Sequence, residues 1–430
     1  MSDVATGAAP TSATGGSLQL AELFRRYGPA LQEARVLRPV QSKVIRAITA
    51  CRTPVLGGHR LWCEHCGFQR YVYHSCRNRH CPQCQSTATA AWVRARTDEL
   101  LPVPYFHNVF TLPHELSTLG LFSEQNQRAL LKQLFDAAAQ TLLEFGRQEL
   151  GGKIGFTLVL HTWDQQLRPH FHIHGLIASG ALSADGTRWI AGGSRFLFPV
   201  HGLSKMFRGK YLDALANLLA QRRLDLPPQS SELDNPASRR RWLRRLRRKS
   251  WVVYSKPPFA GPRKLLDYLG RYTHRVAISN HRILDCRGHQ VCFHYRDRRD
   301  GDRRKTARLP AEEFLRRFLT HVLPDGFRRI RHYGLLANRD RRKRLDDIRR
   351  LLGTPQVPAA DPQPQTAADW MRLLLGIDID RCPACGEWLS QEALPPLALP
   401  LPASTHQHLA TASPSRGPPV RNTPPPRSTA

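Results

Sequence analysis

The chain has 430 residues, 41% of them hydrophobic, so it can bury a sizeable core and a wholly disordered protein is excluded. Its 64 Lys and Arg outnumber its 34 Asp and Glu, for a formal net charge of +30, and such a protein needs a polyanionic partner, usually a nucleic acid. Because no run of about 18 apolar residues and no secretory signal pattern is present, we expect an intracellular, reducing location.

The composition along the chain indicates an N-terminal module, a central domain and a short C-terminal segment. We expect disordered tails over residues 1–17 and over the Pro-rich residues 393–430. Between the tails we expect a helical, cysteine-rich domain over 18–100, a central domain over 101–350, and a linker with a CxxC segment over 351–392. Within the central domain, we expect a basic helical insertion over residues of about 200–250.

Hydrophobic periodicity predicts the elements in chain order. The first helical stretch runs from Leu18 to about Thr49 and is interrupted near Gly28 and Pro29. Further helices are expected over 86–100, 122–148, 203–222, 238–249 and 263–272. Strands are expected over 105–111, 154–163, 170–178, 251–254 and within 275–296. The predicted fold class is α+β, an antiparallel sheet with flanking helices preceded by a small cysteine-rich module.

The cysteines concentrate in close pairs, which in a reducing compartment favours metal binding over disulfides. Cys63 and Cys66 form one CxxC pair, Cys81 and Cys84 form another, and fourteen residues separate the two pairs. Four thiolates in this arrangement suit tetrahedral structural Zn2+, with Cys76 or a nearby histidine as an alternative ligand. Free thiols are the less favoured interpretation. A further pair, Cys382 and Cys385, is half of a zinc site without obvious partners.

Three histidines alternate in the second strand of a predicted hairpin. His170, His172 and His174 share one face of that strand, so their imidazoles can converge on one ion. The alternative is cross-strand packing of half-buried histidines. If the turn centres between residues 166 and 167, His161 lies opposite His172 and becomes a further ligand. A differently shaped turn would offer Asp164 or Gln165 instead.

Two tyrosines lie one turn apart on a predicted helix. Tyr268 and Tyr272 are at i and i+4, flanked by Arg271 and Arg275. Alone, such a pair indicates core packing. Beside a histidine metal site in a basic protein, the same pair indicates two catalytic nucleophiles. A tyrosine hydroxyl with a pKa of about 10 attacks well only when its target is polarised, and a bound metal ion can polarise a phosphodiester.

In this order the motifs resemble the two-tyrosine, IS91-kind rolling-circle transposases of bacterial insertion sequences, within the His-hydrophobic-His endonuclease superfamily. The resemblance covers roughly residues 20–390. It rests on the segments Tyr73–Cys84, Leu160–Trp163, His170–His174, Trp251–Phe259, Tyr268–Ser279, Arg329–Asn338 and Arg381–Gly386.

The resemblance implies an endonuclease with strand-transfer activity on single-stranded DNA at insertion-sequence ends, in the bacterial cytoplasm at the nucleoid. A divalent ion held by His172 and His174 would position the phosphate. Tyr268 and Tyr272 would attack it to give a 5′-phosphotyrosine, whose energy permits rejoining without a nucleoside triphosphate. The family suggests Mg2+ or Mn2+, although imidazoles favour softer ions. Gly175 departs from the Cys that many relatives are expected to carry.

Arginines are the expected contacts to DNA phosphates. Residues 239–249 carry eight positive charges in eleven positions and most simply bind the DNA backbone. The candidate DNA-binding residues are Arg77, Arg79, Arg239, Arg240, Arg241, Arg244, Arg245, Arg247, Arg248, Arg271 and Arg275. Two rival functions are a non-catalytic, zinc-dependent DNA-binding regulator and a tyrosine recombinase. The histidine hairpin argues against the recombinase, which needs no metal.

Overall fold

The structure is a computed structural model, and it describes residues 18–256, 262–273, 277–297, 300–354 and 364–397. The side chains of residues 262, 268 and 271–273 are outside this description. The predicted tails lie outside the described residues, except for 393–397. The prediction of disorder from residue 393 onward is wrong for residues 393 and 394, which end the last strand (Ser390–Leu394).

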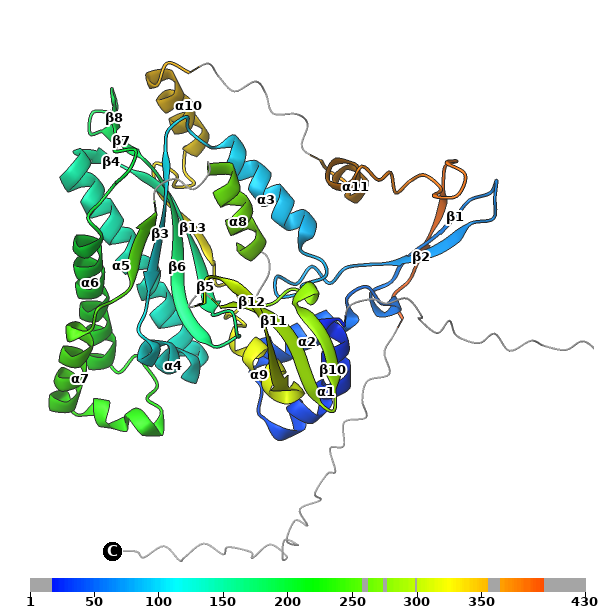
Figure 1. Ribbon diagram of the computed structural model, residues 1–430, viewed down its shortest axis with the longest axis horizontal. Helices are drawn as coiled ribbons and strands as arrows, with labels where there is room; N and C mark the ends of the chain where they lie inside the picture. The colour runs from blue at the N-terminus through cyan, green and yellow to red at the C-terminus, as the bar shows by residue number, and fades with distance from the viewer. Residues whose placement is uncertain (1–17, 257–261, 274–276, 298–299, 355–363, 398–430) are drawn as a thin grey trace, which may run out of the picture.

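A five-stranded sheet forms the centre of the molecule (Figure 1), in the order β13-β5-β6-β3-β9, with every neighbouring pair antiparallel. Its strands are β3 (Tyr105–Thr111), β5 (Gly155–Trp163), β6 (Pro169–Ala178), β9 (Val253–Lys256) and β13 (Ile330–Gly334). The predicted strand over 105–111 and the predicted hairpin are confirmed. β13 lies in a basic region for which the sequence predicted no element.

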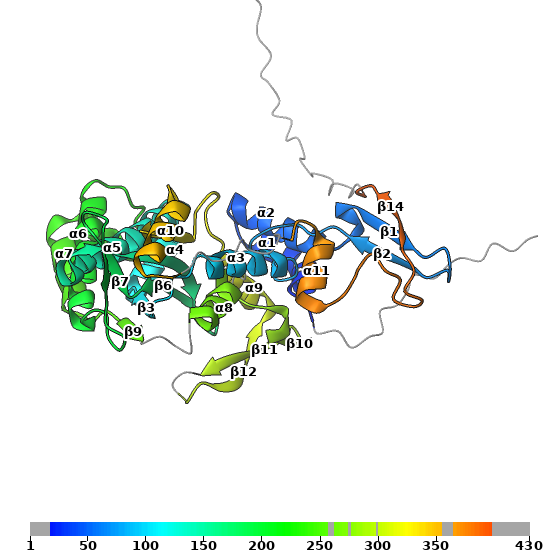
Figure 2. The same cartoon turned by 90° about the horizontal axis from the view of Figure 1, so that it is seen from above.

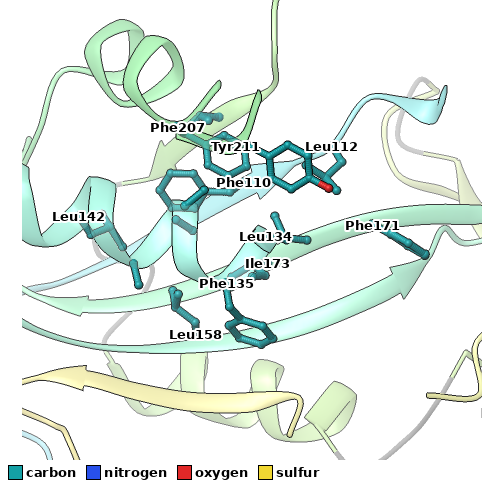
Figure 3. Close-up of a cluster of buried hydrophobic side chains, with 14 of the residues drawn as sticks. Phe110, Leu112, Leu134, Phe135, Leu142, Leu158, Phe171, Ile173, Phe207 and Tyr211 are labelled. Atoms are coloured by element: carbon teal, nitrogen blue, oxygen red, sulfur yellow. The ribbon is translucent and has the colours of Figure 1, made fainter. Parts of the chain in front are cut away.

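One face of this sheet buries the main apolar core against α4 (His114–Phe122), α5 (Glu124–Leu150), α6 (Val200–Ala220) and α7 (Pro236–Arg248). Phe110, Leu158 and Ile173 come from three neighbouring strands and lie in this core (Figure 3). Phe207 and Tyr211 of α6 belong to the same core. Since burial of apolar surface contributes about 25 cal/mol per Å2, the packing of α6 helps to stabilise the sheet.

The opposite face is covered by α3 (Ser86–Asp98) and α8 (Pro262–Thr273) (Figure 1). The contact is made by three leucines of α8 and three residues of β3 and β6: Leu265, Leu266, Leu269, Tyr105, Leu176 and Ala178. The two helices approach closely, because a Cβ at Gly270 would lie 2.3 Å from Cγ2 of Val93. Glycine is the residue that permits this approach.

A second body joins segments that are far apart in the sequence. It consists of α1 (Leu20–Ala34), α2 (Pro39–Ala50), the sheet of β10 (Ile283–Arg287), β11 (Gln290–Asp297) and β12 (Arg303–Pro310), and α9 (Ala311–Thr320). Phe24 and Phe318 meet edge to face, with ring centroids 5.7 Å apart. Residues 20–50 therefore share a core with residues 283–322, across the domain boundary expected near residue 100.

The predicted interruption near Gly28 and Pro29 is wrong, because α1 continues through Pro29 to Ala34. A proline inside a helix costs about 3 kcal/mol. Leu23, Phe24 and Leu31 are each about 1% exposed, and full burial contributes ~1.5–3 kcal/mol per side chain. The apolar face of the helix therefore outweighs the missing hydrogen bond.

A third sheet lies at the end of the molecule far from α5, α6 and α7 (Figure 2). It has the order β14-β1-β2, made of β1 (Gly58–Trp62), β2 (Gln69–Tyr73) and β14 (Ser390–Leu394). The remaining elements are α10 (Arg341–Leu351), α11 (Ala367–Leu375), β4 (Gly152–Lys153), β7 (Gly180–Ser183), β8 (Trp189–Ala191), and the 3-10 turns Pro54–Leu56, Pro228–Asp234 and Asn280–Arg282. Within the described ranges, every helix is too short or too polar to cross a bilayer.

The turn between β5 and β6 is held by side chains from α9 and from the residues that directly flank β10 and α9. Its carbonyls at Gln165, Gln166 and Leu167 accept hydrogen bonds from Arg282, Arg317 and His321, respectively. These contacts fix the turn in one shape.

His321 is fully buried within this set of contacts. Because a carbonyl can only accept, Nε2 of His321 carries the proton that it donates to Leu167, at 3.0 Å. Nδ1 then accepts from the hydroxyl of Thr162, at 3.2 Å. The bond from Thr162 requires an unprotonated Nδ1 and therefore the neutral imidazole, and burial lowers the pKa of His321 to about 4.

We expect the free energy of unfolding to fall as the pH decreases from about 6.5 to about 4. In this window His321 takes up a proton in the unfolded chain but not in the folded chain. Its contribution to the free energy of unfolding, about 3 kcal/mol at most, is therefore lost on acidification. The variant His321→Gln keeps a donor for Leu167 and should show a shallower pH dependence in urea unfolding. Identical slopes for the two proteins would contradict this role.

Candidate active site

The β5–β6 hairpin places His161 directly opposite His172, and Val159 opposite His174. This is the pairing predicted from a turn centred between residues 166 and 167. Asp164, considered as an alternative ligand, instead stabilises the turn: its Oδ1 accepts from the backbone amides of Gln166 and Arg168, both at 2.8 Å.

Three histidines form a compact group on the face of the sheet opposite the main core. One ring nitrogen from each of His161, His172 and His174 lies within 4.8 Å of the others. His161 and His174 are only 4% and 3% exposed. His170, the first of the alternating histidines, is exposed and lies outside this group. Three converging imidazoles are a fit donor set for one divalent ion.

Two further contacts orient the histidine rings. Nδ1 of His172 donates to the backbone carbonyl of His170, at 2.8 Å, which leaves the Nε2 lone pair for a ligand bond. Nδ1 of His174 lies 2.8 Å from Nε2 of His107 on β3, and the two rings are stacked. Partners of this kind set the tautomer of a metal-binding histidine. His107 has no recognisable signal in the sequence, because its role depends on β3 lying beside β6.

The helix that carries the two tyrosines covers the histidine face. Alternate residues of β6 share a face, so Leu176 and Ala178, which contact α8, are on the same side as His172 and His174. Tyr268 and Tyr272 both belong to α8. Their side chains and that of Arg271 are outside the described residues, as is the whole of Arg275.

Four cysteines from residues 51–84 form a zinc-type group: Cys51, Cys76, Cys81 and Cys84. The Sγ atoms of Cys76 and Cys84 are 3.7 Å apart, and all four cysteines are free of disulfides. A tetrahedral site with Zn–S bonds of about 2.3 Å has sulfur atoms roughly 3.8 Å apart. The backbone amide of Asn78 donates to Sγ of Cys76, as amides commonly do at such sites. These residues fit zinc.

The predicted single site of Cys63, Cys66, Cys81 and Cys84 is therefore divided in the structure. Cys81 and Cys84 group with Cys76, the predicted alternative, and with Cys51, which was not predicted as a ligand because it stands outside any CxxC pair. Cys63 and Cys66 group with Cys382 and Cys385. The reason is the intervening hairpin: a five-residue strand spans roughly 16 Å, so β1 moves the first pair away from the second.

The candidate DNA-binding arginines differ in their surroundings. Arg77 is exposed, whereas Arg79 donates to the carbonyls of Phe327 and Pro324 and thereby holds the zinc module against the central domain. On α7, Arg239 donates to the carbonyl of Leu219, and Arg247 pairs with Asp213. The exposed arginines of this helix are Arg240, Arg241, Arg244, Arg245, Arg247 and Arg248.

Comparisons with known proteins agree with this arrangement. Residues 155–344 match a family described as "Putative transposase", and residues 23–112 match the "Transposase zinc-binding domain" of the IS91 kind. The chain is 44% identical over 371 residues to a "Putative transposase y4qJ" of Sinorhizobium fredii (strain NBRC 101917 / NGR234), covering 85% of this chain and 92% of the relative.

A second relative is the "Transposase for insertion sequence element IS801" of Pseudomonas savastanoi pv. phaseolicola, 28% identical over 361 residues, with 83% of this chain and 84% of the relative covered. No solved structure is significantly similar to the chain. One transposase domain thus matches the 190-residue region that contains the histidines and tyrosines, and another matches the cysteine module. The chain belongs to the transposase family that carries an IS91-type zinc-binding domain.

Proposed function

We propose that this transposase nicks and rejoins single-stranded DNA at insertion-sequence ends through a covalent tyrosine intermediate, in rolling-circle transposition. The observation that carries the proposal is the packing of α8, the helix of Tyr268 and Tyr272, on the sheet face that holds the three-histidine group. Such an enzyme would act in the bacterial cytoplasm, at the nucleoid.

The chemistry follows from these groups. Mg2+ or Mn2+ held by His161, His172 and His174 would polarise the scissile phosphodiester. The hydroxyl of one tyrosine loses its proton and attacks the phosphorus. The bond from phosphorus to the 3′ oxygen breaks, and that oxygen takes up a proton to become a free 3′-hydroxyl. The 5′ end stays on the tyrosine, and attack by another 3′-hydroxyl reverses the step without an external energy source.

The two tyrosines permit two successive cleavages with both strands retained. A single nucleophile would have to release its first DNA end before it could attack a second. The neighbouring Arg271 and Arg275 would neutralise the charge that develops on the phosphate oxygens. A zinc-dependent regulator without catalysis remains the rival, and it predicts DNA binding without a covalent product.

The first test is covalent capture. We expect the protein, incubated with a single-stranded oligonucleotide of the element's terminus and Mn2+, to form an adduct that survives a denaturing gel. The adduct should disappear with chelator and in the double variant Tyr268→Phe/Tyr272→Phe.

The matched control is Tyr295→Phe, which removes a tyrosine hydroxyl from β11 in the second body. It should form the adduct as the unmodified protein does. DNA binding with no adduct under either condition, by a protein with a cooperative unfolding transition, would favour the regulator instead.

A second test concerns His107, which we assign as a positioning residue for His174. Replacing it by Ala removes the partner of Nδ1, and removal of such a partner weakens metal binding by about 10–100-fold. We expect Mn2+ affinity, measured by calorimetry without DNA, to fall by this amount and to recover partly in His107→Gln. His201→Ala, an exposed histidine on α6, serves as the control. Equal affinities in all four proteins would refute the assignment.

A third test concerns the basic helix α7. It packs against α6, on the side of the sheet away from the histidines (Figure 1), so its arginines act on affinity and not on the chemical step. We expect the triple variant Arg240→Gln/Arg241→Gln/Arg244→Gln to bind single-stranded DNA with a less steep salt dependence, by about 0.7 in log–log slope for each phosphate that the variant no longer neutralises. Adduct yield at saturating DNA should stay the same. An unchanged slope would exclude α7 from the DNA path.

A further inference from the structure

The first CxxC pair forms a tight turn at the end of β1. The backbone amide of Cys63 donates to the carbonyl of Phe68, at 2.8 Å, and the amide of Gly67 donates back to the carbonyl of Cys63, at 3.0 Å. Gly67 has a φ of 72°, a left-handed conformation that glycine adopts at little cost. This turn presents both thiols on one side of the loop.

The C-terminal pair repeats this turn 319 residues further along the chain. The amide of Cys382 donates to the carbonyl of Glu387, at 2.7 Å, and the amide of Gly386 donates to the carbonyl of Cys382, at 2.9 Å. Gly386 has a φ of 80°. The two segments therefore share the C-x-x-C-G pattern, the same two hydrogen bonds and the same glycine conformation. The pair at Cys81 and Cys84 differs, since there the amide of Cys81 donates to the carbonyl of Asn78.

The two matching turns face each other. Sγ of Cys63 lies 3.5 Å from Sγ of Cys385, and Sγ of Cys66 lies 3.6 Å from Sγ of Cys382. All four sulfur atoms are within 4.8 Å of one another. The distances exceed a disulfide bond of about 2.05 Å and approach the roughly 3.8 Å edge of a tetrahedral zinc–thiolate site.

The sheet around these turns has few buried side chains to stabilise it. Every residue of β2 and of β14 is half-buried or exposed, and on β1 the buried residue is Gly58. Trp388, beside the second turn, is 60% exposed. A small sheet that buries so little apolar surface generally requires a disulfide or a metal ion to hold it together. The cysteines provide the ligands for such an ion.

We propose that Cys63, Cys66, Cys382 and Cys385 form a second structural zinc site, which closes a zinc ribbon from two distant segments of the chain. Binding releases the four thiol protons and yields a four-coordinate ion. The site fixes β14 onto β1, in the register that pairs Trp62 with Ser390 and Gly58 with Leu394. The transposase zinc-binding domain that the chain matches covers residues 23–112 and thus contains half of this site. The C-terminal segment supplies the other half.

The test is the zinc content of the full chain, purified under reducing conditions and measured by mass spectrometry of the metal. We expect two zinc ions per chain in the unmodified protein, one for each four-cysteine group. The variants Cys63→Ser/Cys66→Ser and Cys382→Ser/Cys385→Ser should each retain one. Cys286→Ser is the control: this cysteine lies outside both groups, and a serine hydroxyl can keep the contact with Tyr27.

Hydrogen exchange supplies a readout at the strand itself. We expect amides of β14 to lose their protection in both double-serine variants, while amides of α3, next to the first zinc group, keep theirs. One zinc per chain in the unmodified protein, or a content of two that survives removal of Cys382 and Cys385, would overturn the proposal. Neither the zinc content nor the hydrogen exchange involves DNA, so the outcome of both measurements is independent of the tyrosine chemistry.

Discussion

The candidate site depends on the shape of one turn. In a β-hairpin, a shift of one residue in register would move every side chain of β6 to the other face of the sheet. The contacts from Arg282, Arg317 and His321 to three successive carbonyls hold the turn between β5 and β6 in the shape that sets His161 against His172. Arg317 belongs to α9, and Arg282 and His321 directly flank β10 and α9. The second body therefore influences the geometry of the histidine group through this turn.

The hairpin also explains how one sheet performs two tasks. Residues such as Leu158 and Ile173 point into the main core, and the intervening residues of the same strands carry the histidines. The period of two in a strand separates these roles without any special element. The apolar side anchors the sheet on α5 and α6, which gives the histidine side a rigid base and leaves room for α8.

The sequence permits prediction of whatever depends on neighbouring residues. The alternation of His170, His172 and His174, and the pairing of His161 across a short turn, are local properties, and the structure has them as predicted. The order of the strands is a global property. The contact of His107 with His174, the strand β13, and the packing of residues 20–50 against 283–322 all follow from that order and have no local signal. The same distinction explains the cysteines: close pairs are visible in the sequence, but which pairs meet is decided by β1 and β14.

The pairing of β14 with β1 has a consequence for protein synthesis. Cys66 and Cys382 are separated by 316 residues, so at roughly 5–20 residues per second the ribosome needs about 15–60 s to deliver the second half of this sheet. During that interval β1 has an open edge and two thiols without their partners. A gene copy truncated before the codons for β14 would still encode the histidines and both tyrosines, but its N-terminal hairpin would keep that open edge permanently. The complete sheet therefore requires translation through residue 394.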